Sequence, residues 1–121
     1  MGIKIVVSGG RKFSDLKRLQ RALEAIHRKH HIETLITGPR AGAEEMAYFW
    51  AVTRHIREII TVPACPEVLT GRINYQRRNL DLLETYRPDA VVVFSYHEPD
   101  GMVSVARQYG FKVWEVPAGF R

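Results

Sequence analysis

The chain has 121 residues and a formal net charge of +5, from 18 lysines and arginines against 13 aspartates and glutamates. This length predicts one compact domain over 1–121 and excludes a catalytic domain joined to a separate substrate domain. Hydrophobic residues make up 45% of the chain, and no apolar run approaches about 18 residues, so we expect a globular protein with no membrane span. The net charge favours an anionic partner without identifying it.

The single cysteine, Cys65, excludes an internal disulfide framework and is typical of a reducing compartment. The first residues, MGIKIVVSGG, carry no basic segment before the apolar run and no small-residue cleavage site, so no signal peptide is predicted. We therefore expect the protein in the cytoplasm, or in the host cytoplasm if a phage encodes it.

Short apolar runs alternate with helical patterns along the chain. The predicted strands are 3–8, 34–37, 59–62, 90–95 and 112–116. The predicted helices between them are 16–26, 43–50, 75–86 and 102–109. This alternation predicts a three-layer α/β domain with a parallel sheet and helices on both faces. Ser14 is the expected N-cap of the first helix, Asp15 its first-turn negative charge, and Gly110 the C-terminal cap of the last helix. The most apolar run, 90–95, is expected in the centre of the sheet.

Ligands of such sheets bind at the carboxyl edge, where each strand gives way to the N-terminus of the next helix. The loops expected there are 9–14, 38–42, 63–74 and 96–101. The basic run 27–31 is expected at the opposite edge, at the C-terminal end of the first helix. His27 and His31 have the i, i+4 spacing of metal ligands, but no carboxylate or cysteine accompanies them at motif spacing. We interpret the run as a solvated end that complements the helix dipole, and predict no metal and no cofactor.

The first candidate motif is Gly9-Gly10-Arg11, directly after the first strand. The glycines would let backbone N–H groups approach an anion, and Arg11 could clamp a phosphate or a carboxylate. The alternative is a tight turn with a solvated arginine. The glycine patterns of dinucleotide-binding sites and P-loops are both absent.

The second candidate motif, GPRAGAE, supplies the ligand-binding candidates Gly38, Arg40, Gly42 and Ala43. Glu44 follows in the first turn of a helix, where it could accept hydrogen bonds from a ribose or act as a general base. The alternative role of Glu44 is to stabilise the helix through its dipole.

The remaining candidates belong to the last two loops of the carboxyl edge. Arg78 and Asn79 enter the third helix and could point toward the ligand. His97 could contact the ligand or transfer a proton, and Tyr96 could stack on a nucleobase or pack at the root of the loop.

The segments GGRKF, TGPRAGAEE and RRNLDLLETYRPD, the last before a VVVF strand, have the order and spacing of small SLOG-superfamily proteins. The chain resembles the YspA-related members over 3–116; DprA/Smf proteins and LOG enzymes are other members. The resemblance implies a Rossmann-like sheet of order 3-2-1-4-5, a nucleotide-derived ligand and a homodimer. It also implies that Gly9, Gly10 and Arg11 form the family's glycine-arginine turn. The family's G-A-D segment then corresponds to 42–44, where Glu44 stands in place of the Asp, and its Arg-Asn pair corresponds to 78–79.

The fourth loop departs from the family pattern. SYHEPDG stands where the family has a G-G-x-G-T phosphate cradle, so Pro99 removes an N–H, and Glu98 and Asp100 add negative charge. At about 4 Å and an effective dielectric of about 20, each carboxylate–phosphate contact costs about 4 kcal/mol. The ligand then carries its phosphate elsewhere or is less anionic, or an ancestral activity has been lost.

Three functions follow from these residues. The first is a binding module for a nucleotide or nucleotide-derived small molecule, with a sensing, carrying or sequestering role. The second is an N-glycosidic nucleotide hydrolase of the phosphoribohydrolase type, with Glu44 or Glu98 as the catalytic carboxylate. The third is a DprA-like binder of single-stranded nucleic acid, which the scattered aromatic residues make less favoured. Sequence alone leaves the choice between binding and turnover open.

Overall fold

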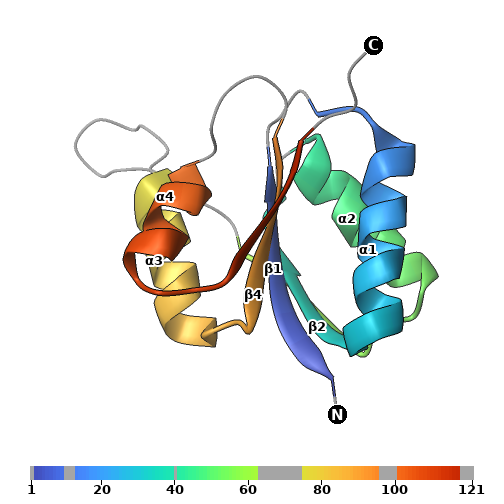
Figure 1. Ribbon diagram of the computed structural model, residues 1–121, viewed down its shortest axis with the longest axis horizontal. Helices are drawn as coiled ribbons and strands as arrows, with labels where there is room; N and C mark the ends of the chain where they lie inside the picture. Colours follow the sequence, from blue (N-terminus) through green and yellow to red (C-terminus); the bar gives the residue numbers. More distant parts are fainter. Residues whose placement is uncertain (1, 10–12, 40, 63–74, 96–100, 118–121) are drawn as a thin grey trace.

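The computed structural model describes residues 2–9, 13–39, 41–62, 75–95 and 101–117, which form three layers around a parallel sheet (Figure 1). The strands are β1 (Ile3–Gly9), β2 (Ile32–Thr37), β3 (Glu58–Thr61), β4 (Ala90–Ser95) and β5 (Val113–Pro117). The helices are α1 (Leu16–His30), α2 (Ala43–Thr53), α3 (Tyr75–Tyr86) and α4 (Gly101–Gln108). The sheet order is β3-β2-β1-β4-β5, which confirms the expected Rossmann-like α/β fold.

The middle of the sheet is β1, which pairs in parallel with β2 on one side and β4 on the other. Val6 is level with Ile36 of β2 and with Val91 of β4. The apolar run of β4 was expected in the centre of the sheet; it is an interior strand, one place from the middle, between β1 and β5. Its side chains are buried because helices cover both faces of the sheet, which is why the run does not alternate with polar residues.

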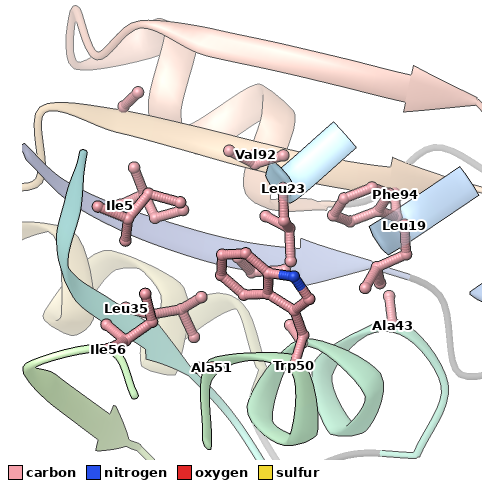
Figure 2. Close-up of a cluster of buried hydrophobic side chains, with 14 of the residues drawn as sticks. Ile5, Leu19, Leu23, Leu35, Ala43, Trp50, Ala51, Ile56, Val92 and Phe94 are labelled. Atoms are coloured by element: carbon pink, nitrogen blue, oxygen red, sulfur yellow. The ribbon is translucent and has the colours of Figure 1, made fainter. Parts of the chain in front are cut away.

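Two hydrophobic clusters hold the helices to the sheet. One lies under α1 and α2, where Leu19, Leu23 and Trp50 pack onto alternate residues of the inner strands (Figure 2). The other lies under α3 and α4, where Leu82 and Met102 pack onto the opposite face of the same strands. Figure 1 shows the two helix pairs on opposite sides of the sheet. Leu16 and Tyr109 share the helical spacing of these buried residues but are exposed by 45% and 54%, because they stand at the first residue of α1 and just after the end of α4.

Several element ends differ from the sequence prediction. The N-cap of α1 is Asp15 and not Ser14, because the Asp15 side chain accepts a hydrogen bond from the backbone N–H of Arg18 at 3.2 Å. Asp15 therefore precedes the first turn. The strand β2 begins two residues earlier than predicted, since Ile32 is already paired with Ile3. Gly110 has φ of +82° just after α4, as a C-terminal cap requires.

Among the described helices, none combines the length and the apolar character that crossing a bilayer needs.

Candidate functional site

The carboxyl ends of the strands and the N-termini of the following helices meet at one edge of the sheet (Figure 1). Gly9 at the end of β1 is level with Phe94 near the end of β4. Thr37 at the end of β2 is level with Thr61 at the end of β3. The N-terminus of α2 lies at this edge, where the free N–H groups of a first helical turn and the positive end of the helix dipole favour an anionic group.

Buried polar side chains are concentrated at this edge. Five polar or charged side chains are buried among the described residues, and four of them belong to the strand ends or to the first two turns of helices. These four are Ser8, Thr37, Glu44 and Asn79, exposed by 2%, 1%, 0% and 4%. Burying a polar group costs free energy unless hydrogen bonds replace the lost water. The edge therefore holds a set of oriented polar groups that have been removed from solvent.

The buried carboxylate of Glu44 is the most costly member of this set. It belongs to the first turn of α2, next to Ala43, whose side chain is wholly buried against the sheet. The helix begins after Gly42, whose φ of +88° is a left-handed conformation that favours glycine. This turn points the start of α2 at the sheet, so that both Ala43 and Glu44 are enclosed. The sequence leaves Glu44 two roles, contact with a ligand or stabilisation of the helix through its dipole, and its position in the first turn of α2 is compatible with both.

The packing of Gly9 explains this residue without a ligand. A Cβ atom there would lie less than 3.0 Å from the carbonyl oxygen of Phe94 and from Cβ of Ala43. Both neighbours belong to the backbone or to a rigid methyl group, so neither can move away cheaply. Gly9 thus allows β1, β4 and α2 to converge, which is a structural role in addition to the expected approach of an anion.

Two kinds of residue at this edge were not singled out from the sequence. Phe13, in the loop before α1, is 1% exposed and packs on Phe94, with ring centroids 5.5 Å apart. Ser8 and Thr37 are buried, and the Thr37 hydroxyl donates to the carbonyl oxygen of Val7 at 3.0 Å. The signal for the last two was present, because each is a polar residue in an otherwise apolar strand close to its carboxyl end.

The structure places only part of the predicted site. Gly9, Gly38, Gly42, Ala43, Glu44 and Asn79 all lie at the carboxyl edge. Arg78 belongs to α3, and its side chain is outside the described part of the structure. The candidates that lie outside the described residues are Gly10, Arg11, Arg40, Tyr96, His97 and Glu98. For all of these residues, participation in a site remains a prediction.

The histidines at the end of α1 are engaged in local contacts. The Nδ1 atom of His27 accepts a hydrogen bond from the backbone N–H of Ile32 at 3.0 Å, and its ring lies 5.0 Å from that of His31 and 5.9 Å from that of Trp50. Burial, and then the neighbouring His31 and Arg54, lower the pKa of His27, while Glu24 opposes this shift. His27 is therefore not the solvated cation that the sequence suggested. Within the described residues, no three His, Cys, Asp or Glu side chains gather as a metal ion would require.

A surface hollow of about 300 Å³ runs along the outer side of α1. It is lined by Lys17, Gln20, Arg21, Glu24 and Arg28, all from this one helix. Small-molecule sites are usually concave, largely apolar and built from several elements. We therefore assign the candidate site to the carboxyl edge and not to this hollow.

Comparison with known proteins gives a family and a fold. No curated protein sequence matches the chain. A solved structure of a universal stress protein in complex with cAMP has a similar fold, with a TM-score of 0.55 and 18% identity. The match covers 98% of this chain and 100% of that protein. The family model described as YspA, cpYpsA-related SLOG family matches residues 3–65, which include β1, α1, β2, α2 and β3. The chain therefore belongs to the YspA, cpYpsA-related SLOG family.

Proposed function

We propose that the protein binds a nucleotide or a nucleotide-derived small molecule at the carboxyl edge of its sheet, in a sensing, carrying or sequestering role. The observation that carries the proposal is the buried carboxylate of Glu44 in the first turn of α2, at the edge of the sheet that also holds the buried side chains of Ser8 and Thr37. Both family membership and the position of the edge in a parallel α/β sheet support it.

The proposed role of Glu44 is to accept hydrogen bonds from the hydroxyl groups of a ribose. A carboxylate has two acceptor oxygens, which suit the two neighbouring hydroxyls of a ribose, and acidic residues near the strand ends serve this purpose in related architectures. Glu44 is fully buried, so entry of the ligand must uncover it. The exchange of internal partners for ribose hydroxyls would keep the carboxylate hydrogen-bonded throughout.

The proposed place of the phosphate is the N-terminus of α2, with arginines of the adjacent loops as further donors. The left-handed turn at Gly42 brings the first N–H groups of the helix to this edge. The candidate arginines are Arg11, Arg40 and Arg78. A ligand held there would avoid the acidic segment 98–100, which replaces the usual phosphate cradle.

A ligand panel tests this function. Thermal unfolding is measured with AMP, cAMP, ADP-ribose and NAD; cAMP is included because the similar universal stress protein was solved with it. A ligand at 100 times its dissociation constant adds about 2.7 kcal/mol to the free energy of unfolding, a shift of several degrees for a domain of this size. The proposal fails if none of the four raises the melting temperature at millimolar concentration.

A second candidate function is hydrolysis of the N-glycosidic bond of a nucleotide. The same observation favours it, because a desolvated carboxylate can stabilise the oxocarbenium-like transition state or activate the water that adds to C1′ as the base leaves. Release of free base from a nucleoside monophosphate, lost in Glu44→Gln, would support turnover. If the protein binds the nucleotide but leaves it intact after prolonged incubation, hydrolysis is excluded and binding is the only function that remains.

A further inference from the structure

The helix α1 carries most of the net charge of the protein. Five lysines and arginines and one glutamate lie within Leu16–His30, so the helix has a formal charge of +4, against +5 for the whole chain. The glutamate, Glu24, is engaged by α2 and the residue after it: its carboxylate accepts a hydrogen bond from the Trp50 indole N–H at 3.0 Å and lies 3.0 Å from the Arg54 guanidinium. The cations of α1 are therefore not neutralised by the carboxylate of their own helix.

Four of these cations are exposed and have no acidic partner. Arg18 lies 3.5 Å from Asp15, the cap of the helix, and is set aside. Within the described part of the chain, no carboxylate forms an ion pair with any of the other four. These exposed residues, which we call the α1 basic face, are Lys17, Arg21, Arg28 and Lys29.

The stability of the helix does not explain the first two members of this face. Lys17 belongs to the first turn of α1, where the positive end of the helix dipole disfavours a cation. Arg21 follows four residues later on the same side of the helix, so the two cations also repel each other. An anionic partner on the outer side of α1 would turn both unfavourable interactions into favourable ones.

The surface around these cations favours an extended partner over a small one. The hollow along the outer side of α1 is lined by residues of this one helix, so it does not enclose a small molecule. The helix contains no Phe, Tyr or Trp, so it offers no ring on which the bases of a single strand could stack. An open row of cations on a straight helix suits a polyanion whose charges have fixed positions, such as a nucleic-acid duplex.

The spacing along α1 matches the width of a DNA groove. The α1 basic face consists of two pairs, Lys17 with Arg21 and Arg28 with Lys29, whose centres are about 14 Å apart at about 1.5 Å per residue. The major groove of duplex DNA is about 12 Å wide, and long basic side chains can reach over the difference. We propose that α1 lies across the major groove of a DNA duplex, with one pair of cations on each phosphate backbone.

The residue between the two pairs permits this approach. Ala25 is exposed and small, so the middle of the helix can come close to the groove without a bulky side chain in the way. Contacts to phosphates carry no sequence information directly. The duplex is therefore bound with little sequence preference, at a surface separate from the carboxyl edge, and the proposal does not depend on a nucleotide ligand at that edge.

The experiment measures binding of a labelled DNA duplex of mixed sequence by fluorescence anisotropy at several salt concentrations. Each phosphate contact lowers the slope of log K against log salt by about 0.9, so the four cations predict a slope of about −3.6. The double variant Arg21→Gln with Arg28→Gln removes one cation from each pair. Its slope should be about −1.8, and it should bind the duplex at least ~10-fold more weakly at low salt.

The matched control removes two positive charges on the opposite side of the sheet. Arg87→Asn with Arg107→Gln changes exposed residues that follow α3 and end α4, and Asn is chosen because Arg87 has φ of +45°. This variant has the same formal charge as Arg21→Gln with Arg28→Gln, so a general effect of net charge would weaken both alike. The control should bind the duplex as wild type does, with an unchanged slope.

Three results would overturn the proposal. They are no binding of the duplex by wild type at low salt and about 100 μM protein, an equal loss of affinity in both double variants, and binding of the matching single strand or of poly-glutamate as tight as that of the duplex. Circular dichroism establishes that each variant is folded. If Arg21→Gln with Arg28→Gln does not fold, Lys17→Gln with Lys29→Gln replaces it, with the same expected loss of affinity and slope.

Discussion

The two edges of the sheet use their polar residues in different ways. At the amino edge polar groups join neighbouring elements through exposed or part-buried contacts: the Lys4 ammonium donates to the Tyr86 carbonyl at 2.9 Å, and the Lys4 N–H donates to Asp89 at 2.8 Å. Thr34, which is level with Lys4, is buried, but its hydroxyl donates to the carboxylate of the exposed residue Glu58 at 3.0 Å. At the carboxyl edge the polar side chains are removed from water, and Glu44 among them is wholly buried.

This difference teaches where function is to be sought. Exposed polar contacts stabilise a fold at little cost, because water can replace a missing partner. A buried carboxylate is costly for a protein that needs only stability, and proteins keep such costs mainly at functional sites. The contrast therefore favours the carboxyl edge as the binding site, and the following experiments change one edge at a time.

The largest effect on stability is expected from Gly9 at the carboxyl edge. Gly9→Ala forces a Cβ atom against Phe94 and Ala43, and overpacking of this kind costs about 2–3 kcal/mol. Gly110 at the amino edge has open space around it but φ of +82°, so Gly110→Asn, which tolerates that conformation, should cost less than about 1 kcal/mol. Urea unfolding measures both. Equal losses of unfolding free energy in Gly9→Ala and Gly110→Asn would contradict the close packing of β1, β4 and α2 around Gly9.

A smaller effect is expected from Asp89 at the amino edge. Asp89→Ala removes the acceptor of the Lys4 N–H and should lower the free energy of unfolding by about 1 kcal/mol. Asp89→Asn keeps an acceptor oxygen and should lose about half as much. Glu84→Ala, an exposed change on the same side of the sheet, should stay within about 0.5 kcal/mol of wild type. An unchanged free energy of unfolding in Asp89→Ala would show that the hydrogen bond between Asp89 and Lys4 does not help to hold the turn between α3 and β4 to β1.

The smallest effect is a pH dependence that originates at His27. Burial lowers the pKa of His27 in the folded chain, so the unfolded chain binds the proton more readily. The contribution of His27 to stability is complete above its ordinary pKa of 6.5 and is lost as the pH falls from there toward the lowered value. His27→Asn keeps an acceptor for the Ile32 N–H but does not titrate.

The contribution of His27 is measured from the free energy of unfolding of both proteins at about pH 7.5 and about pH 5, which lie on either side of the ordinary histidine pKa. Wild type should lose more stability between the two than His27→Asn, since the variant lacks the ring whose protonation folding disfavours. An identical loss in the two proteins would show that protonation of His27 is not disfavoured by folding.

The fold was accessible from the sequence because it depends on alternation and spacing. Short apolar runs and helical repeats predicted every strand and helix to within a few residues, including the strand that ends before Gly38 and the helix that ends at Tyr86. The cap of α1 was missed because Ser14 and Asp15 are both good N-caps, and only the hydrogen bond to Arg18 distinguishes them.

The candidate site stays a prediction, and the sequence located the sheet edge that holds it more readily than the surroundings of each residue. The carboxyl edge follows from topology alone, and the glycines around it were found from their place after strands. Sequence could not show that Glu44 is enclosed while the neighbouring Glu45 is exposed, because this depends on how the left-handed turn at Gly42 aims the helix. Nor could it show that Gly9 serves packing, since the contact partners Phe94 and Ala43 are far away in the chain.

The central claim is that the carboxyl edge binds a nucleotide-like ligand through Glu44. Isothermal titration calorimetry of the panel member that stabilises the protein most, with wild type, Glu44→Gln and Glu84→Gln, tests it directly. Loss of a charged hydrogen bond costs about 1.5–3 kcal/mol, so Glu44→Gln should bind about 10- to 100-fold more weakly. Glu84→Gln, an exposed change on α3, should bind as wild type does. Equal affinity of Glu44→Gln and wild type, with both folded, would contradict the account.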